Sequence, residues 1–136
     1  MNSPPAAVLD ASALLAFLRR EEGADRVEEA LRRRAAIGIV NWAEVLSKVS
    51  EVGEDPEKVV EELREREILG RNLVVCPMSE EQALDVARLR PLTRGAGLSL
   101  GDRACLALGR ALGLPVLTSD GSWRSLALGV RVEAIR

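Results

Sequence analysis

Short apolar β-rich runs alternate with longer segments of helical spacing, and this alternation restricts the possible folds more than any other feature. The runs are AAVL, AIGIV, NLVVCP, LPVLT and VRVEAI. Strands that alternate with helices along a chain are typical of a parallel sheet covered by helices. The sequence therefore predicts a three-layer α/β/α sandwich with a central parallel sheet.

Six helices and one short turn are expected between these runs. The helices are expected at 12–20, 24–34, 42–52, 56–69, 80–89 and 100–112, and the turn near 122–126. Gly23 and Gly113 follow two of these helix ends, and Pro56 stands in a first helical turn. The segment 91–99 is expected to be a loop. With 136 residues, the chain is predicted to form a single domain over 1–136.

The chain contains no histidine and no tyrosine. The absence of histidine excludes a Ser-His-Asp or Cys-His nucleophile, a histidine-liganded zinc site and acid–base catalysis by histidine. Carboxylates, lysine, arginine, serine and a bound metal remain as candidate catalysts. Cys76 and Cys105 stand in apolar surroundings and are predicted to be reduced core residues.

Neither a signal peptide nor a membrane span is predicted. No basic residue precedes Arg19, and Asp10 and Ser12 interrupt the apolar run near the N-terminus. We therefore expect a cytoplasmic protein with no membrane partner. The formal net charge is -2, and all of the 19 basic residues except Lys48 and Lys58 are arginine. Arginine forks match phosphate oxygens, although a solvated helix face is the favoured explanation for any single arginine.

Four acids are expected at one edge of the predicted sheet. Asp10 and Asp120 each follow a predicted strand, and open parallel sheets bind their ligands at the carboxyl ends of strands. Glu44 and Asp102 fall in the first turns of helices that begin beside those carboxyl ends. Gathered carboxylates repel one another and need a compensating cation. Oxygen ligands without histidine or thiolate favour one or two Mg²⁺ or Mn²⁺ ions.

Each acid also has an interpretation that involves no ligand. These alternatives are an N-cap at Asp10, an Asx turn at Asp120, and capping boxes formed by Glu44 with Asn41 and by Asp102 with Ser99. The shared placement of the four acids at one predicted edge is what favours the metal site.

The stretches VLDASALLAFL, IVNWAEVLSKV and LSLGDRACLALGRALGLPVLTSD, with the trailing DGSW, together resemble a PIN-domain ribonuclease. They are most similar to the VapC toxins of toxin–antitoxin pairs, and the resemblance spans nearly the entire chain. The acids with which that family binds divalent metal match Asp10, Glu44, Asp102 and Asp120. The positions that match residues supporting these acids are Ser12, Asn41 and Thr118.

The resemblance implies a metal-dependent endoribonuclease that hydrolyses RNA phosphodiesters with metal-activated water and leaves 5'-phosphate and 3'-hydroxyl ends. Arg103, next to Asp102, is the expected phosphate contact. The aromatic residues Phe17, Trp42 and Trp123 are expected in the core, so base stacking is not expected to dominate RNA binding.

The resemblance also implies a cognate antitoxin and a homodimer. Seven apolar helix positions are candidates for a groove that accepts an antitoxin helix: Leu14, Leu15, Phe17, Leu18, Val45, Leu46 and Val49. Most of them are expected to pack the protein's own core instead.

Three other functions fit parts of the sequence. A PIN nuclease of RNA processing would use the same site without an antitoxin. A non-enzymatic module would use the acidic pocket to bind metal or a basic peptide. A receiver-type domain, in which an aspartate after a strand accepts phosphate, would need a lysine at a strand end, and Lys48 and Lys58 both fall in helical stretches.

Overall fold

The structure is a computed structural model that describes residues 3–136. The strands in this range are β1 (Ala7–Leu9), β2 (Ala35–Gly38), β3 (Leu73–Cys76), β4 (Val116–Thr118) and β5 (Val132–Ala134). The α-helices are α1 (Ala11–Arg19), α2 (Ala24–Arg32), α3 (Ile39–Glu51), α4 (Pro56–Glu65), α5 (Glu80–Thr93) and α6 (Leu100–Leu112). Two short 3-10 helices are η1 (Arg94–Ala96) and η2 (Gly121–Ser125).

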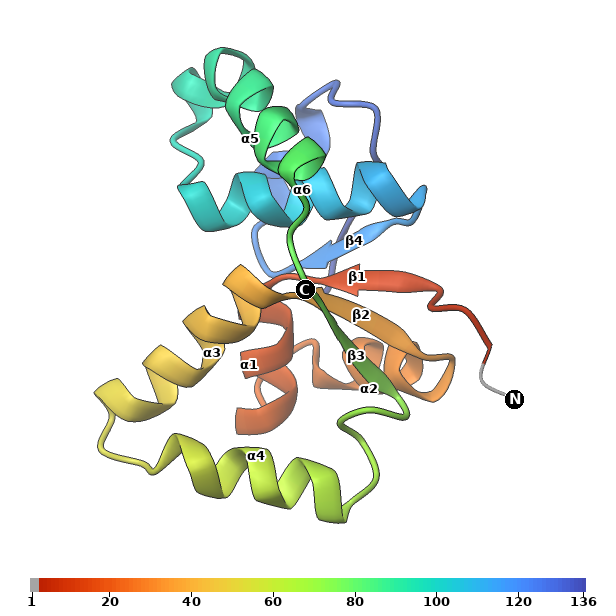
Figure 1. Ribbon diagram of the computed structural model, residues 1–136, viewed down its shortest axis with the longest axis vertical. Coiled ribbons are helices and arrows are strands. Elements are labelled where there is room, and N and C mark those ends of the chain that lie inside the picture. The colour runs from red at the N-terminus through yellow and green to blue at the C-terminus, as the bar shows by residue number, and fades with distance from the viewer. Residues whose placement is uncertain (1–2) are drawn as a thin grey trace.

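The five strands form one parallel sheet in the order β3-β2-β1-β4-β5. The central strand is β1, in which Val8 pairs with Ala36 of β2 on one side and with Val116 of β4 on the other. The chain builds outward from β1 to β3 and then crosses back to add β4 and β5. Figure 1 shows the arrows of β1 and β4 pointing to the same side of the molecule, where α3 and α6 begin.

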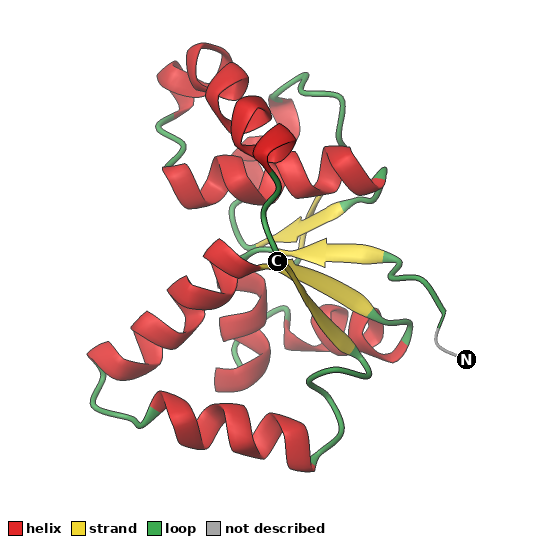
Figure 2. Cartoon of the chain, in the orientation of Figure 1, coloured by secondary structure: helices red, strands yellow, loops and turns green. Residues whose placement is uncertain are grey.

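The alternation of side chains along the strands divides the core into two clusters, one on each face of the sheet. Leu9 and Ile37 belong to the cluster beneath α1, α2, α3 and α4, whereas Val8 and Ala36 belong to the cluster beneath α5 and α6. Figure 2 shows these two groups of helices on opposite sides of the strands. The predicted three-layer α/β/α sandwich is therefore confirmed.

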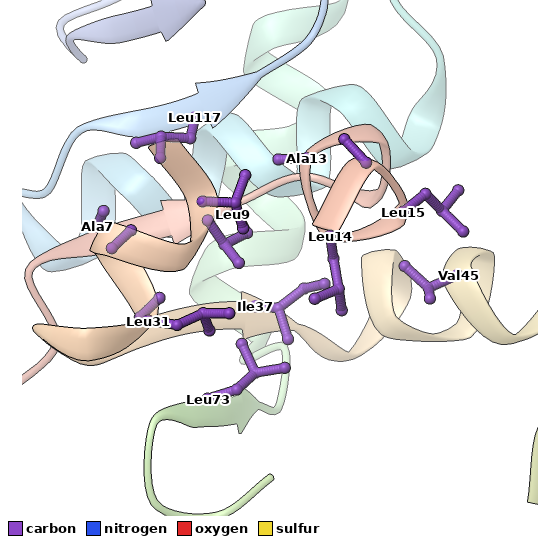
Figure 3. Packing of buried hydrophobic residues seen from close by; sticks show 14 of the residues in the cluster. Ala7, Leu9, Ala13, Leu14, Leu15, Leu31, Ile37, Val45, Leu73 and Leu117 are labelled. Atoms are coloured by element: carbon purple, nitrogen blue, oxygen red, sulfur yellow. The ribbon is translucent and has the colours of Figure 1, made fainter. Parts of the chain in front are cut away.

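The first cluster shows how the helices are held on the sheet. Leu14 of α1 points toward the strand residues Ile37 and Leu73, and Leu31 of α2 lies beside them (Figure 3). Leu9, Leu14 and Ile37 are all fully buried. This packing fixes the start of α1 on the sheet. It therefore also fixes the position of Asp10, the residue that precedes α1.

Several element boundaries differ from the sequence prediction by up to four residues, including the end of α4 at Glu65 instead of 69, and two of these differences have a clear physical reason. The run AIGIV was predicted as strand throughout, but β2 ends at Gly38 and α3 begins at Ile39, before the predicted start at Trp42. Pairing with β3 ends at the contact of Gly38 with Cys76, and the early helix start buries Asn41 and Trp42. Tertiary packing thus outweighs the β propensity of this run.

The predicted loop 91–99 begins later than expected, because α5 continues through Pro91 to Thr93. Proline removes the hydrogen bond to the carbonyl four residues earlier, and both Pro91 and Ala87 are exposed, so solvent can satisfy that carbonyl. On the opposite side, Leu89 and Thr93 are fully buried, and the Thr93 hydroxyl donates to the Leu89 carbonyl at 2.8 Å. Burial of this face maintains the helix past the proline.

Both cysteines are free thiols in the described part of the chain; Cys105 is buried and Cys76 is half-buried. Among the helices of residues 3–136, none combines the length and the apolar composition that crossing a membrane requires.

Candidate active site

The site lies where the order of the strands reverses. The chain leaves β1 toward β2, whereas β4 lies on the other side of β1, so the loops after β1 and β4 diverge. Open α/β sheets bind ligands in the crevice formed at such a point. Asp10 follows β1 and Asp120 lies two residues after β4, so the structure places both at the carboxyl edge of the sheet, as the sequence predicts.

Asp10 is buried and is the N-cap of α1. Its Oδ1 accepts hydrogen bonds from the Ala13 amide at 2.8 Å and from the Ser12 hydroxyl at 2.7 Å. Burial raises the pKa of Asp10 above its usual value, against hydrogen bonds from Thr118, Ser12 and Ala13 that lower it, and the charge of Asp102 raises it further. The N-cap interpretation is thus correct for this residue, but the cap alone does not explain why an acid occupies a buried, charge-disfavouring position.

Ser12 and Thr118 connect the ends of β1 and β4. The Ser12 hydroxyl donates to Asp10 and accepts from the Ser119 amide at 3.0 Å. The Thr118 hydroxyl, which is fully buried, accepts from the Asp120 amide at 3.0 Å. These bonds restrict the orientation of Asp10 and of the backbone that carries Asp120.

Glu44 lies in the second turn of α3 and is half-buried. Asn41, one turn earlier, donates from Nδ2 to Glu44 Oε1 at 3.0 Å and to the Gly101 carbonyl at 3.0 Å. The N-cap of α3 is Gly38, and no side chain caps this helix. The predicted capping box of Glu44 with Asn41 is therefore wrong, because α3 begins earlier than expected, and Asn41 instead joins Glu44 to α6.

Asp102 lies in the first turn of α6, where it forms the predicted capping box with Ser99. Asp102 Oδ2 accepts from the Ser99 amide at 2.9 Å, and the Asp102 amide donates to the Ser99 hydroxyl at 3.1 Å. The capping box uses one carboxylate oxygen, and Oδ1 is in none of the hydrogen bonds found in residues 3–136.

Three of the four predicted acids act on one another electrostatically. Burial raises the pKa of Glu44, the hydrogen bond from Asn41 lowers it, and the charges of Asp102 and Asp10 raise it. The same three acids also affect Cys105. Burial raises the pKa of the Cys105 thiol well above its usual value, and the charges of Asp10, Asp102 and Glu44 raise it further. Cys105 is fully buried one turn after Asp102, so the three carboxylates surround the start of α6.

Asp120 stands apart from this group. Its Oδ1 accepts from the Ser122 amide at 3.0 Å and from the Ser122 hydroxyl at 2.6 Å, as the N-cap of η2. These two bonds lower the pKa of Asp120, which is exposed, and none of the other three acids contributes to that shift. The predicted Asx-type turn is present, and Asp120 is exposed beyond the carboxyl end of β4.

Arg103, the predicted phosphate contact, extends toward α5. Its Nη1 donates to the Val86 carbonyl at 3.0 Å, and its Nε is buried. The side chain joins α6 to α5, and its role as a phosphate contact stays a prediction. Arg124 is a second candidate that the sequence alone did not single out: it is exposed in η2, and its Nε donates to the Gly121 carbonyl next to Asp120.

The donor set suits a hard dication. None of the ion pairs found in residues 3–136 involves Asp10, Glu44 or Asp102. Across the same residues, no group of three or more acids or thiols is gathered closely enough to hold a metal ion. Mg²⁺ usually takes only one or two carboxylates and completes its shell with water and substrate phosphate oxygens, so one or two of these acids are enough to bind it.

The family model for the PIN domain matches residues 7–128. No curated protein matches the chain in sequence. A toxin–antitoxin complex from Klebsiella pneumoniae is 21% identical, with a TM-score of 0.70 over 96% of this chain and 98% of that chain. DNA-bound VapBC from Salmonella typhimurium is 18% identical, with a TM-score of 0.72 over 98% of this chain and 100% of that chain. FitAcB from Neisseria gonorrhoeae is 23% identical, with a TM-score of 0.68 over 95% and 97%. At these identities the structural likeness shows a shared fold.

Proposed function

Because the chain belongs to the PIN domain family, we propose that it is a nuclease toxin, a divalent-metal-dependent endoribonuclease with a cognate antitoxin. The observation that carries this proposal is the convergence of Asp10, Glu44 and Asp102 at the reversal of strand order without an ion-pair partner. Burial and then neighbouring carboxylate charges raise the pKa values of Asp10 and Glu44, and such shifts are typical of a site that binds a cation. The similarity in fold to toxin–antitoxin complexes supports the toxin role.

Asp10, Glu44 and Asp102 would hold one or two Mg²⁺ or Mn²⁺ ions, with Asp120 as a further ligand or as a support. A dication held there would supply Lewis-acid activation of a water for in-line attack on an RNA phosphodiester and a positive charge for the leaving oxygen. Two dications would change the formal charge of the chain from the -2 of the sequence to about +2, which removes the electrostatic obstacle to RNA.

The chain's own residues prepare this site by orientation. Ser12 and the α1 backbone leave Asp10 little freedom to rotate, because both bind Oδ1. Asn41 directs Glu44 toward α6, and the capping box holds one oxygen of Asp102. Carboxylates held in this way lose little conformational entropy when a cation binds.

RNA would be recognised mainly through its phosphates. Trp42 and Trp123 are buried, as predicted, so they are unsuited to stacking on bases, whereas Phe17 is half-buried instead of lying in the core. Arg124 is exposed beside Asp120, so it is the better placed of the two arginines to contact a phosphate. Arg103 would first have to leave the Val86 carbonyl.

A groove lined by residues of α1, α2 and α4, none of which is one of the four acids, is a candidate site for the antitoxin. Of the seven apolar positions predicted for it, Leu14, Leu15, Val45 and Val49 are buried in the core. Two adjoining hollows of about 890 and 350 Å³, lined in common by Leu18 and Arg66, lie over α1, α2 and α4. Charged residues of both signs surround this apolar floor, which suits an amphipathic helix.

A homodimer is also part of the proposal, because the family resemblance implies one. Leu84, Leu92 and Leu100 are exposed large apolar side chains on α5 and α6 that a second copy could cover. Light scattering coupled to size-exclusion chromatography measures the mass directly. A monomer at micromolar concentration would remove this part of the proposal and leave the nuclease unaffected.

The proposal is tested by incubating the purified chain with Mn²⁺ and a mixed RNA pool, with a chelator control and the variants Asp10→Asn and Asp102→Asn. We expect metal-dependent cleavage by the wild type and none by either variant, with folding verified by circular dichroism. Cleavage in chelator, or full activity of either variant, would contradict the mechanism. Mn²⁺ binding without cleavage would indicate the non-enzymatic module instead.

The toxin role has a separate test, because a PIN nuclease of RNA processing would share the same chemistry. Co-expression with the product of the adjacent gene should yield a stable complex in which RNA cleavage is suppressed. If no adjacent product binds or inhibits the nuclease, the RNA-processing function is favoured.

A further inference from the structure

We propose that Gly101 is a positioning residue for Glu44: the missing side chain at 101 is what allows the Glu44 carboxylate to reach the start of α6. This inference rests on the proposed metal-dependent nuclease. A Cβ atom at Gly101 would lie 2.0 Å from Glu44 Oε1, 2.7 Å from its Cδ and 3.1 Å from Oε2. Real Cβ atoms do not approach other atoms that closely, so Glu44 occupies the space that any other residue at 101 would fill.

Backbone conformation gives no other reason for glycine at this position. Gly101 is the second residue of α6, after the N-cap Ser99, and it is not one of the glycines with positive φ. Glycine in a helix is less favourable than alanine by roughly 0.5–1 kcal/mol. The helix would therefore be more stable with alanine at 101, and the reason for glycine is found in its contact with Glu44.

The same position is tied to Glu44 by a second contact. Asn41 Nδ2 donates to both the Gly101 carbonyl and Glu44 Oε1, each at 3.0 Å. Both partners can only accept hydrogen bonds, so the Asn41 side chain must turn its NH₂ group toward them. Asn41 thus holds the carboxylate of α3 against the first turn of α6, next to Asp102.

A methyl group at 101 would displace Glu44 without disrupting the fold. The three heavy atoms nearest to it all belong to the end of the Glu44 side chain, which is flexible. Glu44 would rotate toward solvent, lose its bond with Asn41 and move away from Asp102. The expected loss is therefore in cation binding, while stability stays the same or rises.

The experiment compares Gly101→Ala with a matched control, Gly95→Ala. Gly95 lies in η1, also without positive φ, and a Cβ there would meet nothing within 4 Å. Two measurements are made: the side-chain amide resonances of Asn41 by ¹⁵N NMR in chelator, and Mn²⁺ affinity by calorimetry. Thermal unfolding in chelator verifies the fold of each variant.

In Gly101→Ala we expect shifted Asn41 amide resonances, Mn²⁺ affinity reduced roughly 10- to 100-fold, and an unfolding temperature equal to or above that of the wild type. Gly95→Ala should match the wild type in both measurements. In a Glu44→Ala background, Gly101→Ala should cause no further loss of Mn²⁺ affinity, because the two residues act as one unit.

The outcomes separate this inference from the proposed function. Unshifted Asn41 resonances in Gly101→Ala, wild-type Mn²⁺ affinity, or an equal loss of affinity in the Glu44→Ala background would each overturn the role of Gly101. If the wild type binds no Mn²⁺ while Gly101→Ala shifts the Asn41 resonances, the metal-dependent function fails and the positioning of Glu44 by Gly101 stands.

Discussion

Replacing Asp10 separates the two roles of this residue, as a helix cap and as a buried charge. Asp10→Asn keeps an acceptor for the Ala13 amide and the Ser12 hydroxyl and removes the charge. Because burial and Asp102 raise the pKa of Asp10, its ionised form destabilises the folded state. In chelator at pH 7, we expect the free energy of unfolding of Asp10→Asn to equal or exceed that of the wild type.

Asp10→Ala removes the charge and the cap together. The Ala13 amide is buried and would lose its acceptor, which costs about 1–3 kcal/mol, in the range measured for loss of an N-cap. The Ser12 hydroxyl would lose one acceptor but keep its bond from the Ser119 amide. Asp10→Ala should therefore be less stable than Asp10→Asn by about 1–3 kcal/mol.

The pH dependence follows from the sign of the pKa shift. Between the unfolded value of about 3.8 and the raised folded pKa, the folded wild type binds more protons at Asp10 than the unfolded chain does. Its free energy of unfolding therefore falls as pH rises through this window, and Asp10→Asn lacks that component. Glu44 contributes a change of the same sign, and part of it depends on the Asp10 charge, so the difference between the two proteins reports Asp10 together with its coupling to Glu44.

The assay is urea denaturation in chelator at a series of pH values from 4 to 7, repeated at pH 7 with Mn²⁺, because the folded pKa of Asp10 lies above its usual value of 3.8. Other carboxylates titrate in the lower part of this range, so the wild type and Asp10→Asn are compared at each pH. No histidine titrates in the upper part. Mn²⁺ should stabilise the wild type but not Asp10→Asn, which would reverse their order of stability. The reasoning is refuted if Asp10→Asn in chelator at pH 7 is as unstable as Asp10→Ala, or if the wild type and Asp10→Asn change equally with pH.

Four further predictions concern the surroundings of the site. Arg103→Ala should lower the free energy of unfolding by about 1–2 kcal/mol in chemical denaturation, because it removes the bond from α6 to α5. Arg124→Ala should leave the free energy of unfolding unchanged and lower kcat/KM for RNA roughly tenfold, which is a loss of about 1.4 kcal/mol in transition-state binding. An unchanged kcat/KM would exclude a phosphate contact by Arg124. Burial alone would raise the pKa of Glu133, but its ion pairs with Arg26 and Arg131 outweigh burial and lower that pKa. The stabilisation of the folded state by ionised Glu133 is therefore present above pH 4.5 and is lost as pH falls through the folded pKa. Glu133→Gln should lower the free energy of unfolding by about 1 kcal/mol at pH 7 in urea denaturation, and by less in acid. Leu18→Asp should abolish co-purification with the adjacent gene product while RNA cleavage continues, and retained binding would place the antitoxin elsewhere.

The strands and helices could be predicted from local patterns, and the deviations occurred where tertiary contacts outweighed them. All five strands overlap the predicted runs, and the helices begin and end within about four residues of their predicted bounds. Ile39 and Val40 have β-branched side chains that favour a strand, but burial of Asn41 and Trp42 requires a helix there. Pro91 is typical of a loop, but it stands on the exposed side of a helix whose other side is buried.

The candidate site could be predicted in its location but not in its contacts. Asp10 and Asp120 were expected at the carboxyl ends of strands, and both lie there. Only the structure distinguishes Asp10, which shares an electrostatic environment with Glu44 and Asp102, from Asp120, which is bound to Ser122. The metal-binding roles of all four acids stay predictions.

The sequence by itself determined the order of strands and helices and that Asp10 and Asp120 follow strands, because apolar periodicity and helix-terminating residues act between near neighbours in the chain. The tertiary structure decided which acids face one another, that Arg103 extends toward α5, and that Gly101 accommodates Glu44. The physical reason is distance along the chain. Glu44 and Gly101 meet only because α3 and α6 pack together, and the direction of a side chain between two packed helices is set by that packing.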